Sequence, residues 1–125
     1  MKIFMLFLAS LIFVKSESQI KSPDAIKVAG VTFNEVVERL LNSGYTFEKI
    51  DSNYKLISTD WKTTKSDWME LNKFRINVRL VDSTAIFSEE WQKKPVKNSK
   101  YTRECFDEID KLANSFKKPV EYARL

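Results

Sequence analysis

The sequence contains no histidine, one cysteine and two glycines among its 125 residues. Without histidine, a Ser-His-Asp triad, a Cys-His pair and nearly all zinc sites are excluded. Two glycines are too few for a glycine-rich loop that cradles phosphate groups. Cys105 has no second cysteine to pair with, so a disulfide framework within the chain is excluded. Because Cys105 precedes Phe106 in a helical pattern, we interpret it as a small buried hydrophobic residue rather than a reactive thiol.

Basic and acidic residues are close to balanced. The chain has 21 Lys and Arg against 17 Asp and Glu, which gives a net charge of +4. The densest basic cluster consists of Lys93, Lys94, Lys97 and Lys100 beside Pro95. This composition favours a solvated connector over a phosphate-binding site. Since a nucleic-acid-binding protein normally has a basic patch or stripe, we expect no nucleic acid partner.

The first 16 residues have the form of a secretory signal peptide. Lys2 precedes an apolar run from Ile3 to Val14, which is shorter than the roughly 20 residues that a membrane-spanning helix needs. Cleavage after Ser16 is our first choice and cleavage after Ser18 the alternative, while Lys15 keeps open an uncleaved anchor. We expect an exported protein, periplasmic or extracellular, with no stable membrane span after cleavage.

The central part of the sequence predicts a β-meander. Tyr54–Lys62, Lys73–Val81 and Thr84–Gln92 alternate between apolar and polar residues, as strands do. A strand over Tyr45–Ile50 precedes them, and Asp51-Ser52-Asn53 supplies the turn between the first two strands. In the clearest of these strands one face is apolar, and we expect that face to lie in the core.

Helical periodicity flanks the meander on both sides. A capping box at Thr32 to Glu35 opens a helix over Phe33–Ser43, and Gly44 ends it. A second amphipathic pattern runs from Cys105 to Phe116, and Pro119 follows it. The sequence therefore predicts an α+β fold in the order helix, four-stranded antiparallel meander, helix, with both helices on one face of the sheet.

Two segments outside this pattern are ambiguous. Residues 17–31 form an amino-terminal approach segment, in which Ala25–Val28 has a short extended pattern. Val120–Leu125 is a tail that either adds an edge strand or frays. Length and composition support one domain, over residues 32–125.

Carboxylates next to tryptophans are the candidates for acid–base chemistry. They are Asp60 before Trp61, Asp67 before Trp68, and Glu89 and Glu90 before Trp91. A glycosidase needs two carboxylates that face each other across a bond, and sequence neighbours alone do not establish that arrangement. We expect no catalytic residue, cofactor or metal. A histidine-free carbohydrate hydrolase is the least favoured interpretation.

The same tryptophans suit a binding surface, because indole combines a large contact area with a polar N–H group. They would equally complete a small core and its rim. Arg75 and Arg79 lie on the polar side of their strand. The candidate binding surface consists of Trp61, Trp68, Arg75, Arg79 and Trp91. The sequence thus predicts a non-enzymatic exported domain that binds a partner protein or an apolar ligand, and the alternative is a secreted inhibitor of a hydrolase.

The segment Leu56–Trp61, followed by Phe74–Leu80 and Ala85–Phe87, resembles small bacterial cell-envelope domains of unassigned activity. It is more distantly similar to the helix-grip domains of the outer-membrane assembly lipoprotein BamC. The resemblance spans Thr32–Phe116 and departs from those lipoproteins in having no lipidation cysteine. It implies a non-enzymatic role in the cell envelope and supplies no catalytic residues.

Overall fold

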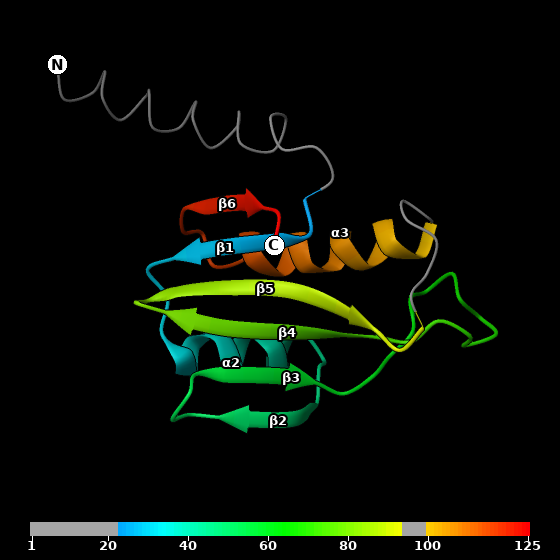
Figure 1. The fold of residues 1–125 in the computed structure, drawn as a ribbon, viewed down its shortest axis with the longest axis horizontal. Helices are drawn as coiled ribbons and strands as arrows, with labels where there is room; N and C mark the ends of the chain where they lie inside the picture. Colours follow the sequence, from blue (N-terminus) through cyan, green and yellow to red (C-terminus); the bar gives the residue numbers. More distant parts are fainter. Residues whose placement is uncertain (1–22, 94–99) are drawn as a thin grey trace, which may run out of the picture.

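The computed structural model describes residues 23–93 and 100–125, so the expected signal peptide and two members of the lysine cluster, Lys94 and Lys97, lie outside the described residues. Six strands form one antiparallel sheet in the order β2-β3-β4-β5-β1-β6, and both helices lie on the same face of it (Figure 1). The elements are β1 (Ala25–Ala29), α2 (Phe33–Asn42), β2 (Phe47–Asp51), β3 (Leu56–Thr59), β4 (Phe74–Val81), β5 (Thr84–Trp91), α3 (Lys100–Asn114) and β6 (Val120–Ala123). The fold is therefore α+β and rich in sheet.

The prediction of a four-stranded sheet between two helices is wrong. Strands β1 and β6 add to the meander at its β5 side, and Ile26 of β1 lies opposite both Phe87 of β5 and Tyr122 of β6. Ile26 and Val28 of β1 and Val120 and Tyr122 of β6 are buried, so the added strands complete the core. They are only five and four residues long, which is too short for the alternation to identify a strand from sequence.

The connection from β1 into α2 is fixed by the β4–β5 turn. The backbone amides of Gly30 and Val31 donate to the carbonyl oxygen of Ser83, at 2.9 and 3.1 Å. Asp82 and Ser83 both have positive φ, as a two-residue turn between twisted antiparallel strands requires. Because the turn joins Val81 directly to its partner Thr84, it also fixes the register of the whole β4–β5 hairpin.

Helix α2 begins with the capping box expected from sequence. The Thr32 hydroxyl accepts a hydrogen bond from the Glu35 amide at 3.2 Å, and the Glu35 carboxylate accepts one from the Thr32 amide at 3.1 Å. The helix ends at Asn42, and Gly44 has a positive φ of 90° beyond it. These contacts satisfy backbone groups that the ends of a helix otherwise leave unpaired.

The core lies between the sheet and the two helices. Val36 and Leu40 of α2 and Cys105 and Ile109 of α3 are buried against apolar side chains of the sheet. The burial of Cys105 matches its interpretation as a small hydrophobic residue. The Arg39 guanidinium of α2 lies 5.0 Å from the ring centroid of Phe116, so α2 also contacts the segment that follows α3.

The strand predicted over Tyr54–Lys62 is shorter in the structure. It ends at Thr59, whose hydroxyl accepts a hydrogen bond from the Ile76 amide at 2.9 Å. Lys62 then makes an isolated bridge with Phe74, with two backbone hydrogen bonds of 2.8 Å. The chain between them forms a loop over residues 63–73 that projects from one end of the sheet (Figure 1). Within residues 23–93 and 100–125, no helix has the length and apolarity needed to cross a membrane.

Candidate binding surfaces

The sheet face turned away from the helices carries a polar surface, which we call the open face. Its side chains come from alternate positions of β3, β4 and β5, and they are less buried than their neighbours on the helix side. The residues of the open face are Leu56, Ser58, Arg75, Asn77, Arg79, Ile86, Ser88 and Glu90. The pairing of β4 with β5 sets Arg75 opposite Glu90 and Arg79 opposite Ile86.

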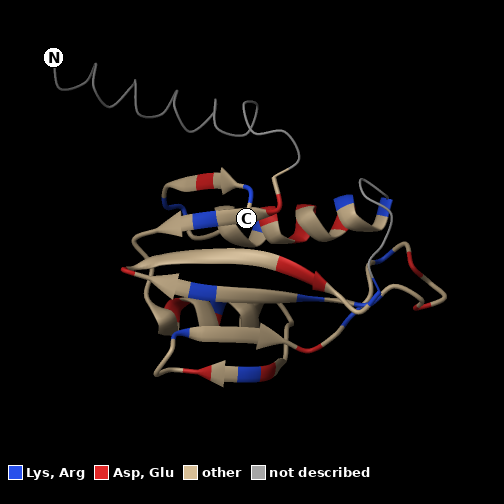
Figure 2. Ribbon diagram, viewed as in Figure 1, with Lys and Arg blue, Asp and Glu red and all other residues tan. Residues whose placement is uncertain are grey.

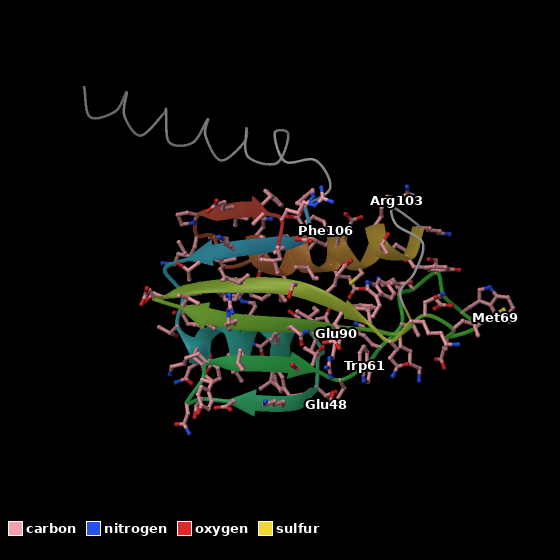
Figure 3. All side chains as sticks on the ribbon, in the orientation of Figure 1. Glu48, Trp61, Met69, Glu90, Arg103 and Phe106 are labelled. Carbon is pink, nitrogen blue, oxygen red and sulfur yellow. The ribbon has the colours of Figure 1, made fainter. Side chains whose placement is uncertain are left out.

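Arg75 is the best-fixed side chain of the open face. Its Nε and Nη2 atoms donate to the Glu90 carboxylate, with Nε to Oε1 at 3.1 Å and Nη2 to Oε1 at 3.0 Å, and its Nη1 pairs with Glu48 of β2. The guanidinium lies 4.4 Å from the ring centroid of Trp61, a cation–π distance. Glu48, Trp61 and Glu90 lie near the same end of the sheet (Figure 3). Only 19% of the Arg75 side chain is exposed, so its orientation is fixed by three neighbours.

Further hydrogen bonds extend this arrangement across β3. The Asn77 amide nitrogen donates to Glu90 Oε1 at 2.8 Å, and the Ser58 hydroxyl donates to Asn77 Oδ1 at 2.8 Å. The hydrogen bond from Asn77 and the charge of Arg75 hold the pKa of Glu90 below its usual range. We call Ser58, Arg75, Asn77 and Glu90, with Glu48, the Arg75 network.

A half-open depression of about 490 Å³ lies on the open face and is lined in part by this network. Leu56 and Ile86 contribute apolar surface to it, and Lys49 and Arg79 are exposed at its edge. Leu125 lines one side, and its backbone amide donates to the Asp24 carboxylate at 2.7 Å. The depression therefore combines apolar area, fixed polar groups and exposed positive charge.

The five residues of the expected binding surface do not form one surface. Trp61, Arg75 and Arg79 lie on or beside the open face. Trp91 faces the helix side, where its ring lies 5.4 Å from that of Phe74 and packs against the core. Trp68 lies elsewhere, in the loop of residues 63–73, and is 83% exposed. Sequence patterns did not identify Glu48, Ser58 and Asn77 as members of the Arg75 network. The register of a β4–β5 hairpin with a two-residue turn would have been enough to place Glu90 opposite Arg75.

The loop of residues 63–73 presents a second surface. Trp68, Met69 and Leu71 are 83%, 58% and 64% exposed, and Met69 lies at the outer end of the loop (Figure 3). Asp67 is buried beneath them, and its carboxylate accepts hydrogen bonds from the amides of Leu71 and Asn72 at 3.3 and 2.7 Å. We call Trp68, Met69 and Leu71 the apolar tip.

The four candidate catalytic carboxylates lie in different parts of the structure and do not form one site. Glu89 and Glu90 point to opposite faces of the sheet, because they are neighbours along β5. Both oxygens of Asp67 accept loop amides, and Asp60 accepts a hydrogen bond from the Thr46 hydroxyl at 2.5 Å. Among the described residues, no group of three or more acidic or cysteine side chains is placed to hold a metal ion.

Glu89 lies on the helix side of the sheet, close to Cys105 and Trp91. Burial raises the pKa of its carboxyl above the usual range, although interactions with the Cys105 thiol and the Trp91 indole oppose this shift. Burial and the nearby Glu89 carboxyl also raise the pKa of the Cys105 thiol, which stays protonated. These groups are therefore part of the interior beneath α3 rather than of an open site.

Neither protein-family models nor curated proteins provide a match to this sequence. The similarity to bacterial envelope domains and to BamC therefore stays a prediction.

The different positions of Trp68 and Trp91 predict different effects of alanine substitution. Trp68→Ala should change the free energy of unfolding by no more than about 0.5 kcal/mol, because its side chain is largely in solvent. Trp91→Ala should lower it by about 2–4 kcal/mol, because it removes packing against Phe74 and the core. Urea unfolding of both variants measures the difference. A large loss for Trp68→Ala would place that side chain in the core.

The raised pKa of Glu89 predicts a pH-dependent effect. The folded state binds the Glu89 proton more tightly than the unfolded state does, so the protonated carboxyl stabilises the fold. This stabilisation is fully present below the pKa of Glu89 in the unfolded state and is lost as pH rises through its pKa in the folded state. Glu89→Gln, which is neutral at every pH, should therefore gain stability relative to the unsubstituted protein as pH rises above the unfolded-state pKa of a glutamate, about 4.3. Thermal unfolding over a range of pH measures the difference in melting temperature.

Glu90→Gln provides the matched control for this experiment. Because the pKa of Glu90 is lowered, its ionised form stabilises the fold above the unfolded-state pKa, and the variant should lose stability relative to the unsubstituted protein as pH rises. The interior position of the Glu89 carboxyl would be contradicted by either of two results. The melting-temperature difference between Glu89→Gln and the unsubstituted protein would not vary with pH, or it would change with pH in the same direction as the difference for Glu90→Gln.

Proposed function

We propose that this chain is an exported, non-enzymatic domain whose open face binds a partner protein. The observation that carries the proposal is the Arg75 network, in which one arginine is held by Glu90, Glu48 and the ring of Trp61. Arginine and tryptophan are enriched at the residues that contribute most to protein–protein binding. A side chain that is already oriented loses little conformational entropy when a partner docks on it.

The lining of the depression favours a protein over a small apolar ligand. Small-molecule sites bury most of the ligand surface, whereas the depression on the open face is about half open to solvent and is lined by the charged side chains of Arg75, Arg79 and Glu90. Its mixture of apolar area from Leu56 and Ile86 with fixed polar groups from Ser58 and Asn77 is typical of a protein interface. No described feature selects a hydrolase as the partner, so an inhibitor remains a special case of this proposal.

The charge of the open face indicates which kind of partner would bind. Arg75 is paired with both Glu48 and Glu90, while Lys49 and Arg79 are exposed beside the depression, so positive charge exceeds negative charge by one among these five groups. A partner with acidic side chains opposite Lys49 and Arg79 would associate faster and more specifically than a neutral one. We therefore propose an acidic protein surface as the partner.

Site-specific photo-crosslinking in the host of this protein tests the proposal. A photoreactive amino acid at Ile86 should give one protein adduct, because Ile86 lies opposite Arg79 in the depression. The yield of the adduct should fall about tenfold or more with Arg79→Glu, since this change reverses the charge that the partner meets. Circular dichroism should show that the variant stays folded.

Glu38, exposed on α2, is the control position on the other side of the molecule. Crosslinking from Glu38 should not give the same adduct. The proposal fails if Ile86 and Glu38 give the same products, if Ile86 gives none, or if Arg79→Glu leaves the adduct unchanged.

A further inference from the structure

The apolar tip is a second surface that the proposed function does not use. Three large apolar side chains, Trp68, Met69 and Leu71, are exposed within four residues of chain. Scattered single exposed hydrophobic residues are common in folded proteins, but a contiguous group marks an interaction site. The loop projects from one end of the sheet, so the tip is a protrusion and not part of the depression on the open face (Figure 1).

The loop is built to hold these side chains outward. The carboxylate of buried Asp67 accepts hydrogen bonds from two backbone amides of the loop. The Asp67 amide donates to the Thr64 carbonyl at 3.1 Å, and the Glu70 amide donates to the Asp67 carbonyl at 3.0 Å, so Asp67 belongs to two consecutive turns. The hydroxyl and amide of Ser66 both donate to the Glu104 carboxylate, which ties the loop to α3. The exposure of the tip is therefore a property of an internally hydrogen-bonded loop.

Basic side chains surround the base of this loop. Lys65 and Lys73 lie on either side of the apolar tip in the sequence and are exposed. The Gln92 amide donates to the Lys73 carbonyl at 3.0 Å, which brings exposed Lys93 to the same place. The link from Ser66 to Glu104 places the first turn of α3, with exposed Lys100, beside the loop.

Figure 2 shows Lys and Arg positions in blue on the ribbon at this end of the molecule, on the loop and at the start of α3. Asp67 is buried and engaged, so the carboxylates that offset this charge are Glu70, exposed in the loop, and Glu104, which is bound by Ser66 at its base. Four exposed lysines therefore exceed the acidic groups near the tip by two. We call Lys65, Lys73, Lys93 and Lys100 the lysine collar.

We infer that the apolar tip inserts into an anionic lipid surface while the lysine collar contacts its headgroups. A protruding tip would need a matching pocket on a protein partner, whereas a lipid interface accepts it without a preformed shape. Tryptophan is favoured at the boundary between headgroups and acyl chains, and lysines near an anionic surface add electrostatic attraction. The inference goes beyond the proposed function, because the open face would remain free for its partner.

An environment-sensitive dye on the full chain tests this inference. The Met69→Cys variant carries the dye on the apolar tip, and Cys105 does not compete for labelling because its thiol is buried. With vesicles of phosphatidylcholine and phosphatidylglycerol, the dye emission should rise several-fold and shift to the blue. Vesicles of phosphatidylcholine alone should give a weaker response, because the lysine collar then meets no net charge.

Ser52→Cys is the matched control, since it lies in the β2–β3 turn at the opposite end of the sheet (Figure 1). It should give no response, even where the expected amino-terminal apolar segment holds the chain on the vesicle. Adding Lys65→Glu and Lys73→Glu to the Met69→Cys variant should remove most of the response to phosphatidylglycerol.

Three results of the vesicle experiment would overturn the inference. They are no change for the Met69→Cys label on anionic vesicles, an equal change for the Ser52→Cys label, and a response that depends neither on phosphatidylglycerol nor on the two lysines. A response that requires an added protein instead of lipid would also overturn it and would make the tip a protein-docking loop. None of these outcomes depends on the open face, so failure here is distinct from failure of the proposed function.

Discussion

The burial of one face of the sheet by both helices is the constraint on which the rest of the structure depends. In a six-stranded antiparallel sheet, side chains alternate between the faces, and only the face under α2 and α3 is removed from water. The opposite face must therefore be stable in contact with solvent. It meets this requirement through ion pairs and hydrogen bonds around Arg75, which satisfy polar groups without excluding water.

The same constraint explains why the candidate binding residues separate. Trp91 and Glu89 point under α3 and become part of the interior, while Glu90, one residue away, joins the open face. The carboxylate partners of Arg75 keep 52% (Glu48) and 43% (Glu90) of their side chains exposed, so water screens both ion pairs and each contributes little to stability. The Arg75 network is therefore better explained as a preorganised surface than as a major support of the fold. The apolar tip likewise lies outside the core and contributes little to it.

Sequence patterns predicted the parts of the fold in which the local rule is strong. The capping box at Thr32 to Glu35 predicted the start of α2, and the alternation over Lys73–Val81 and Thr84–Gln92 predicted β4 and β5, which the structure pairs with Arg75 opposite Glu90. The sequence patterns did not show whether residues of β1 and β6 form strands, because both segments are short. Packing against α3, which is far from β1 in the sequence, buries β1 in the folded protein. Local sequence does not distinguish Trp68 from Trp91, because each follows an acidic residue and only packing separates them.

The most direct test of the account is to measure folding stability and partner crosslinking together on Arg75→Met. The substitution keeps a long apolar side chain over Trp61 and leaves Glu48 and Glu90 partly exposed rather than buried without a partner. The account predicts a free energy of unfolding within about 1–2 kcal/mol of the unsubstituted protein. It also predicts loss of the adduct formed from Ile86. An unchanged adduct, or a loss of stability large enough to unfold the domain, would show that Arg75 is retained for the fold and not for binding.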